Sequence, residues 1–226
     1  MQHVKGVEHV IWDWNGTLLD DVSAALAALN QVLVEHSLTP LADEEAYRSV
    51  FDFPVVDYYA RVGFDCGPGG NFEAAAHRYI EVYGAKSRTC ALHATAPGTI
   101  DELDRRGVAQ VILSAARRDH LMLQINRAGL DPLRFSDVLG LNDIYAHSKV
   151  GLAQTWIAES GLDPARMLMV GDTAHDLEVA NAMGVSCVLY SGGHHPRSRL
   201  GGLGVPVIDS LDAVLDFVVS GPIRSQ

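Results

Sequence analysis

Apolar and polar positions along the chain follow two alternating rhythms. Short apolar runs at residues 9–12, 108–113, 167–170 and 185–190 are typical of buried strands. Between most of them, apolar side chains recur every three or four residues, as on one face of a helix. Strands that alternate with helices of about ten residues predict an α/β fold, in which helices cover both faces of a mostly parallel sheet.

The remaining elements of this repeating part can be placed from the same pattern. Helices are expected at residues 98–106, 117–128, 149–160, 176–183 and 211–219, and further strands at residues 137–139 and 205–208. Four of these helices are directly followed by a glycine, the residue that most often ends a helix: Gly107, Gly129, Gly161 and Gly184.

The stretch after the first strand differs, because it contains helical patterns and no strand pattern. Its expected helices are residues 22–36, 42–51, 57–62 and 71–85. Since the first strand must join a sheet whose other strands begin near residue 108, this block is an insertion. We therefore predict a Rossmann-like core of residues 1–19 and 94–226, and a helical cap of residues 20–93. Two chain crossings would hinge the cap over the carboxyl ends of the strands, where doubly wound sheets bind ligands.

Composition excludes several classes of protein. The formal net charge of −11 disfavours a nucleic-acid-binding surface. The three cysteines, Cys66, Cys90 and Cys187, are too scattered for a disulfide framework or a zinc site. There is no apolar run near the roughly 20 residues that a membrane span needs, and the first eight residues do not resemble a signal peptide. We expect a cytoplasmic protein without a membrane partner.

Chemically active side chains occur where the predicted strands end. Asp13 and Asp172 follow strands, Ser114 ends another, and Lys149 begins a helix after a loop, while Asp176 lies four residues beyond Asp172. Parallel strands bring these ends to one edge of the sheet. Clustered carboxylates need a cation, and oxygen ligands beside a phosphate favour Mg²⁺. Lys149 would add positive charge, Ser114 would bind a phosphoryl oxygen, and Asp13 would be free to attack phosphorus.

Four sequence motifs, in order, resemble those of the haloacid dehalogenase superfamily. Residues 13–20 (Asp-Trp-Asn-Gly-Thr-Leu-Leu-Asp) resemble motif one, D-x-D-x-[TV]. Residues 111–114 resemble motif two, Lys149 motif three, and residues 171–176 (Gly-Asp-Thr-Ala-His-Asp) motif four, G-D-x-x-x-D. The position of the helical insertion is similar to the helical C1 cap of the phosphoglycolate phosphatase-like branch.

The resemblance implies a role for each matching residue. Asp13 would be the nucleophile, Mg²⁺ would bind Asp13, Asp172 and the main-chain carbonyl of Asn15, and Asp176 would support it directly or through water. The candidate substrate-binding positions are Trp14, Gly16, Thr17, Ser114, Ala115 and Lys149. The implied reaction is hydrolysis of a small phosphomonoester, such as phosphoglycolate, through an aspartyl-phosphate. The expected partner is therefore a small phosphorylated metabolite.

Asn15 departs from the family pattern, which has an aspartate there as general acid and base. An amide cannot protonate a leaving alkoxide, and general acid–base catalysis contributes roughly 10²–10⁴-fold. Three explanations remain open: a slow phosphatase or a substrate with a good leaving group, another acid from the cap or substrate, and a residue changed on purpose to trap a complex. We favour a native variant.

Three other functions compete with this hypothesis. A carbon–halogen hydrolase of the same superfamily needs no metal, which Asp172 and Asp176 disfavour. A phosphonate hydrolase needs a lysine in the cap, and Lys86 lies at the wrong end of it. A catalytically weak protein that binds phosphate esters is supported by Asn15 alone.

Several other polar residues are interpreted as structural. Tyr58 and Tyr59 are expected in the packing of the cap, and the side chains of Arg48 and Arg61 in solvent, although each of the four could reach a substrate. In addition, Arg117 and Arg118 are expected to face water, His175 to be exposed, and His194 and His195 to be ordinary loop residues.

Overall fold

A six-stranded parallel sheet lies at the centre of the structure, a computed structural model that describes residues 6–141 and 149–218. Its strand order is β3-β2-β1-β4-β5-β6, and every neighbouring pair is parallel. The strands are β1 (His9–Trp12), β2 (Ala109–Arg117), β3 (Asp137–Leu141), β4 (Met167–Gly171), β5 (Ser186–Tyr190) and β6 (Val207–Ile208). The predicted α/β class with a parallel sheet is confirmed.

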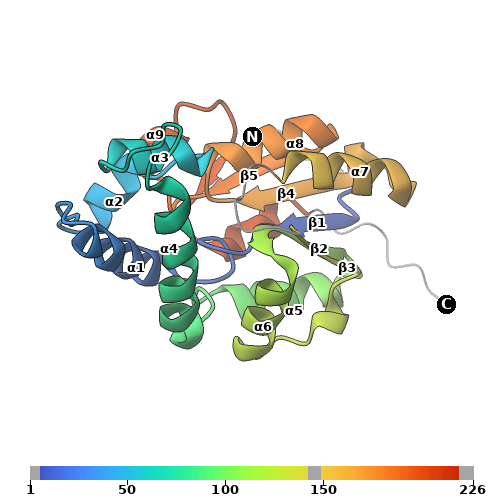
Figure 1. Ribbon diagram of the computed structural model, residues 1–226. Helices are drawn as coiled ribbons and strands as arrows, with labels where there is room; N and C mark the ends of the chain where they lie inside the picture. Colours follow the sequence, from blue (N-terminus) through green and yellow to red (C-terminus); the bar gives the residue numbers. More distant parts are fainter. Residues whose placement is uncertain (1–5, 142–148, 219–226) are drawn as a thin grey trace.

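Helices cover both faces of the sheet (Figure 1). One face carries α5 (Ala96–Arg105) and α6 (Arg118–Arg127), and the other carries α7 (Val150–Ser160) and α8 (Ala174–Met183). Side chains of β1 alternate between two buried clusters: Val10 and Trp12 pack on the α5 and α6 side, and Ile11 packs on the α7 and α8 side. This alternation follows from the two-residue period of a strand, and it shows that β1 is buried on both faces of the sheet.

Three details differ from the prediction. Strand β2 continues four residues beyond the expected end at residue 113, across a register shift between Leu113 and Arg117, so Ser114 lies inside the strand. The segment expected as a final helix is a 3-10 helix, Leu211–Asp216. A short helix that the sequence pattern did not reveal, α9 (Arg197–Leu200), precedes β6.

Four helices lie between β1 and β2 in the chain and beyond the carboxyl ends of the strands (Figure 1). They are α1 (Val22–Glu35), α2 (Glu44–Val50), α3 (Val55–Arg61) and α4 (Phe72–Lys86), and we call them the inserted helices. Their buried side chains form a cluster of their own, separate from the two clusters that flank the sheet. None of the helices in the described ranges is long and apolar enough to cross a membrane.

The two connections between the sheet and the inserted helices run side by side. Leu19 and Leu92 form an antiparallel bridge. The main-chain N–H of Asp20 donates to the carbonyl of Ala91, and that of His93 to the carbonyl of Leu18, each at 2.9 Å. The connections are therefore held to each other as well as to the two parts that they join.

Candidate active site

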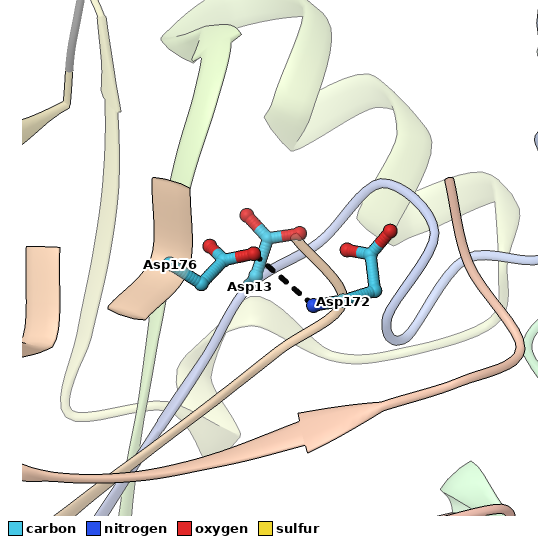
Figure 2. Close-up of side chains that lie close together, drawn as sticks. All are labelled: Asp13, Asp172 and Asp176. Atoms are coloured by element: carbon cyan, nitrogen blue, oxygen red, sulfur yellow. Dashed lines mark hydrogen bonds between the residues drawn. The ribbon is translucent and has the colours of Figure 1, made fainter. Parts of the chain in front are cut away.

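Three buried carboxylates meet at the carboxyl end of β1 and β4 (Figure 2). Asp13 follows β1, and its main-chain N–H donates to the carbonyl of Val170 at 2.9 Å, which ties it to β4. Asp172 follows β4, and Asp176 lies in the first turn of α8. Each residue offers one oxygen, and these oxygens lie within 4.8 Å of one another. The structure thus brings together the three aspartates that the sequence singles out.

Lys149 supplies positive charge to this cluster. Its Nζ forms ion pairs with Asp13 and with Oδ1 of Asp176, the latter at 2.7 Å, and donates to the carbonyl of Leu113 at 3.2 Å. The carboxylates of Asp13 and Asp176 hold the pKa of the buried ammonium above its ordinary value, although burial opposes this. Lys149 is therefore a permanent cation between Asp13, which follows β1, and the Leu113 carbonyl of β2.

One ammonium does not balance three carboxylates. Burial raises the pKa of Asp13 well above its ordinary value, with Asp176 and Asp172 adding to the effect and Lys149 opposing it. Burial likewise raises the pKa of Asp172 to about 6. Both carboxyls would ionise more readily if a second cation lay between them. A buried, all-oxygen set of ligands suits a hard divalent cation such as Mg²⁺.

Asp176 is already engaged on both oxygens. Its Oδ2 accepts from the main-chain N–H groups of Asp172 and Thr173, at 3.1 and 2.9 Å, and from the Thr173 hydroxyl at 2.7 Å. Together with the bond that Thr173 Oγ1 accepts from the Asp176 N–H, these contacts form a capping box at the start of α8. Asp176 therefore fixes the loop that carries Asp172 and holds Lys149 in place.

Two glycines allow the loops to approach Asp172. Gly16 has a φ of +77°, and a Cβ there would lie 2.4 Å from Oδ2 of Asp172. At Gly193 a Cβ would lie 2.1 Å from the same oxygen. A side chain at either position would displace the carboxylate, so the close packing of the loop after β1 and the loop after β5 against Asp172 depends on glycine.

The candidate phosphate-binding residues divide into two groups. Ser114, Ala115 and Lys149 line a cavity of about 170 Å³ together with Asp13, as the sequence predicts for a phosphate site. The main-chain N–H groups of Gly16 and Thr17, by contrast, donate hydrogen bonds within their own loop. Gly16 donates to the carbonyl of Leu19 and to Oδ1 of Asp21, and Thr17 donates to the carbonyl of Trp14. These two N–H groups are therefore not free to bind a phosphoryl oxygen of a substrate.

Two side chains of the same loop also point elsewhere. The Trp14 indole is fully buried and donates to Gln124 at 3.1 Å, away from the cavity. The Thr17 hydroxyl donates to Oδ1 of Asp172 at 2.9 Å, so Thr17 orients a carboxylate. Both residues stabilise the loop after β1 without lining the cavity.

The amide of Asn15 is held by a buried carboxylate that the sequence did not single out for chemistry. Its Nδ2 donates to Oδ2 of Asp21 at 3.0 Å and to the hydroxyl of Tyr83 at 2.7 Å. The Tyr83 hydroxyl in turn donates to the same Asp21 oxygen at 2.5 Å. Asp21 lies at the start of α1, Tyr83 belongs to α4, and both line the cavity together with Asn15.

The prediction that His194 is an ordinary loop residue is wrong. Its side chain is 6% exposed, and Nε2 lies 3.3 Å from Oδ1 of Asp21. Nδ1 shares a hydrogen bond with the hydroxyl of Tyr47 at 2.9 Å, and the main-chain N–H donates to Asp172 at 2.6 Å. Although burial opposes it, the Asp21 carboxylate raises the pKa of His194 to about 9. The loop is buried because the inserted helices cover it.

His175, which was expected to be exposed, and His195, which was expected to be an ordinary loop residue, are both buried. His175 is 5% exposed, and its ring stacks on Phe53 with the centroids 4.8 Å apart. His195 is fully buried, and its Nδ1 accepts from the main-chain N–H of Ala174 at 3.0 Å. Burial lowers the pKa of His195 to about 4, so this imidazole is neutral.

The residues considered as cap contacts differ in their surroundings. Tyr58 and Tyr59 belong to the buried cluster of the inserted helices, as expected, and they also line the cavity. Arg48 donates to the carbonyl of Gly193 at 2.8 Å, and Arg61 pairs with Asp52 at 3.0 Å. Neither arginine lines the cavity.

The adjacent residues Arg117, at the end of β2, and Arg118, at the start of α6, also differ in their surroundings. Arg117 pairs with Asp119 at the surface, as expected, whereas Arg118 donates to the main-chain carbonyl of Val138 and so ties α6 to β3.

Comparison with known proteins identifies the family. Residues 10–190 match the family described as haloacid dehalogenase-like hydrolase. The chain belongs to this family. The resemblance seen in the four motifs is thereby confirmed, and the chain is a hydrolase.

The relatives of this hydrolase are phosphatases by name. It is 28% identical to the Dickeya dadantii protein named "Probable phosphatase IndB", over 84% of each chain. It is 25% identical to phosphoglycolate phosphatase of Synechococcus elongatus, over 86% of this chain and 88% of that one. A haloacid dehalogenase-like hydrolase from Streptococcus pneumoniae has the same fold, with a TM-score of 0.81 at 17% identity over 94% of this chain and 99% of that one. The relatives place this enzyme among hydrolases that act on phosphate esters.

Proposed function

We propose that the chain hydrolyses a small phosphomonoester through a covalent phosphoryl group on Asp13. The observation that carries the proposal is the position of Asp13. Its carboxylate is paired with Lys149 and opens into a cavity lined also by Ser114 and Asp172. A carboxylate nucleophile, an ammonium and a hydroxyl around one space fit the transfer of a dianionic phosphoryl group.

The chemistry runs in two steps. An oxygen of Asp13 forms a bond to phosphorus while the ester oxygen leaves with the bonding electron pair and takes up a proton from water. Water then attacks the phosphorus of the aspartyl-phosphate, which releases inorganic phosphate and restores the Asp13 carboxylate. Lys149 and the Ser114 hydroxyl hold the phosphoryl oxygens through both steps.

A divalent cation, which we take to be Mg²⁺, fits the carboxylate cluster. Asp13, Asp172 and the main-chain carbonyl of Asn15 would hold it, with Asp176 supporting it directly or through water. Such a cation supplies positive charge that keeps the carboxylates ionised and screens them from the incoming phosphate dianion. The pKa values of Asp13 and Asp172 are raised in the protein alone, and the positive charge of a bound cation would lower them.

The inserted helices act as a cap in this proposal. Residues 20–93 would close over a core made of residues 1–19 and 94–226, with the paired connections near Leu19 and Leu92 as the hinge. The cavity is lined from both parts, so a bound ester would be enclosed only when they meet. Enclosure limits the substrate to a small phosphorylated metabolite, and the names of the relatives make phosphoglycolate one candidate.

Activity assays with a matched variant test the proposal. Acetyl phosphate and p-nitrophenyl phosphate, both with good leaving groups, should be hydrolysed in the presence of Mg²⁺. Asp13→Asn should lower kcat by at least about 10³-fold, because an amide cannot replace the nucleophile. Retained activity in Asp13→Asn, with the same thermal stability as the parent, would refute the covalent mechanism. Mass spectrometry of the acid-quenched parent enzyme should find the added phosphoryl group on Asp13.

A further inference from the structure

The two ends of the cavity differ in chemistry. The end at the sheet carries the carboxylates, Lys149 and Ser114. The end at the inserted helices is built largely of aromatic rings, among them Tyr47, Phe51, Phe53, Tyr58, Tyr79 and Tyr83. An ester whose phosphoryl group lies at Asp13 must therefore place its alcohol part against these rings.

The described wall of the aromatic end offers no free cation. Of the lysines and arginines in residues 6–141 and 149–218, Lys149 alone lines the cavity, and it is paired with Asp13 and Asp176 at the opposite end. The arginines of α2 and α3 are turned to other partners, Arg48 to the Gly193 carbonyl and Arg61 to Asp52.

His175 does not fill this role, because its Nδ1 is already paired with the Glu178 carboxylate at 2.9 Å. His194 does not fill it either. One of its ring nitrogens faces the Asp21 carboxylate, and the other shares a hydrogen bond with the Tyr47 hydroxyl. A second negative charge on the substrate would therefore be buried among rings and carboxylates without a partner, which is strongly unfavourable.

Two buried polar atoms at this end have no hydrogen-bond partner among the described residues. They are the hydroxyl of Tyr58 and Nε2 of His175, and both residues line the cavity. The Tyr58 side chain belongs to α3, whereas His175 comes from α8 and stacks on Phe53. Buried polar atoms are normally paired, so these two mark where neutral polar groups of a ligand would bind.

The volume of the cavity limits the size of the alcohol. At about 170 Å³ it is comparable to an apolar cavity of about 150 Å³ that holds benzene. Part of the space belongs to the phosphoryl group, so a single ring or a short alkyl chain fits. A nucleoside or a lipid chain does not.

We propose that the preferred substrate is the phosphate ester of a small, uncharged, ring-bearing or alkyl alcohol, recognised by the aromatic end of the cavity and by hydrogen bonds to the Tyr58 hydroxyl and to Nε2 of His175. This inference rests on the proposed phosphatase function and names the class of alcohol that the same site accepts. It ranks phosphoglycolate, whose alcohol part is a carboxylate, below a neutral ester of similar size.

Two pairs of esters that differ by one carboxylate test the ranking. The first pair is benzyl phosphate and 4-carboxybenzyl phosphate, in which the charge is remote from the reacting bond. The second pair is ethyl phosphate and phosphoglycolate. We expect kcat/KM to favour the neutral member of each pair by at least about 10-fold. Equal values, or a preference for the carboxylates, would overturn the inference.

Acetyl phosphate separates this inference from the proposed function, because its small leaving group makes little use of the aromatic end. If acetyl phosphate is hydrolysed in an Asp13-dependent manner and the carboxylate esters are nevertheless preferred, only the inference fails. If neither acetyl phosphate nor any ester is hydrolysed, the proposed function fails and the inference with it.

A charge introduced into the wall gives an independent measurement. Ile80, on α4, lines the cavity and is partly exposed, so it tolerates a longer polar side chain better than the buried rings do. Ile80→Arg should raise the ratio of kcat/KM for 4-carboxybenzyl phosphate over benzyl phosphate by at least about 10-fold relative to the uncharged control Ile80→Gln. Acetyl phosphate turnover and the Tm report whether both variants are folded. An unchanged ratio in two folded variants would contradict the absence of a cation at this end.

Discussion

The Nδ2 of Asn15 lies 3.0 Å from Oδ2 of Asp21, so the amide that stands where the family carries a general acid is paired with a carboxylate from the start of α1. Tyr83 joins both groups through its hydroxyl. The surroundings of Asn15 thus contain the carboxylate of Asp21, six residues further along the chain. Although burial opposes it, His194, Tyr83 and Asn15 lower the pKa of Asp21, so this carboxylate is ionised.

Asn15→Asp should raise the turnover of esters with poor leaving groups. Two carboxyls at this distance share a proton, which raises one of the two pKa values and provides a proton donor near neutral pH. We expect kcat for an alkyl phosphate to rise on the order of 10²-fold, with a smaller change for p-nitrophenyl phosphate, whose leaving group needs little help. Steady-state kinetics with both esters measure the difference.

The double variant Asn15→Asp, Asp21→Asn is the matched control, since it keeps one amide and one carboxylate in contact with their positions exchanged. Its kcat for the alkyl ester should still exceed that of the parent. The pH above which kcat falls should be lower than in Asn15→Asp, because no second carboxyl raises the pKa of the proton donor. If neither variant is faster than the parent, the missing proton donor does not limit the reaction.

Magnesium should stabilise the protein in a pH-dependent manner. In the cation-free fold, the pKa of Asp172 is about 6 against an ordinary 3.8, so the folded state binds more protons than the unfolded state between these values. Stability without cation should therefore fall as pH rises from about 4 to 6. A divalent cation must displace that proton, so the rise in Tm on adding Mg²⁺ should be small at pH 5 and largest above pH 7.

When the Mg²⁺ concentration is 100 times its dissociation constant, the free energy of unfolding should rise by about 2.7 kcal/mol. Asp172→Asn is the control, because it removes both the titration and a proposed ligand while it keeps the size of the side chain. Thermal unfolding at pH 5, 6 and 7.5 with and without Mg²⁺ measures both effects. A shift of equal size at all three pH values, or one retained in Asp172→Asn, would place the cation elsewhere.

The part of the site that follows from topology was predictable from sequence. Asp13 and Asp172 follow neighbouring parallel strands, and the carboxyl ends of such strands must lie at one edge of the sheet. Lys149 and Ser114 reach the same place for the same reason, although the register shift in β2 puts Ser114 inside the strand. The ends of the strands follow from periodicity, which a single sequence displays directly.

The part that depends on packing between distant segments was not predictable. His194 follows a strand in a glycine-rich loop, and nothing in its local sequence shows that Tyr47 and Asp21 cover it. The aromatic positions of the inserted helices fall at helical spacing, which marks an apolar face but does not distinguish a core from a cavity wall, because both use the same face. The pair Asp20-Asp21 was a usable signal, since one of two adjacent acids at a helix start is free for another role.

His194→Gln should remove a pH dependence of stability. The folded pKa of His194 is about 9 against an ordinary 6.5, so its ion pair with Asp21 contributes stability that is fully present below about pH 6.5 and is lost as pH rises through 9. The parent should lose on the order of 2 kcal/mol of unfolding free energy between pH 6.5 and 9.5 from this group. Urea unfolding at the two pH values measures it, and glutamine can still donate to Asp21 without titrating.

Lys149 remains in both proteins of that comparison, so its titration cancels in the difference between parent and His194→Gln. A pH dependence of the same size in both proteins would show that the His194 imidazole is not charged in the folded state.

Tyr58→Phe should stabilise the ligand-free protein, whereas Tyr47→Phe should destabilise it. The Tyr58 hydroxyl is buried without a partner among the described residues, and its removal relieves a desolvation cost of about 1 kcal/mol. The Tyr47 hydroxyl is equally buried but bonded to His194 at 2.9 Å, so its loss should cost about 1 kcal/mol. Urea unfolding with equal m values measures both changes.

The two variants delete the same atom from neighbouring rings, whose centroids lie 6.3 Å apart, so they control for each other in size and burial. With a bound ester that carries a neutral hydroxyl, such as 3-hydroxybenzyl phosphate, the sign at Tyr58 should reverse: Tyr58→Phe should then raise KM, because the hydroxyl has gained its partner. A Tyr58→Phe protein that is less stable than the parent, or that binds this ester equally well, would mean that the hydroxyl is already satisfied in the free enzyme and does not face the substrate.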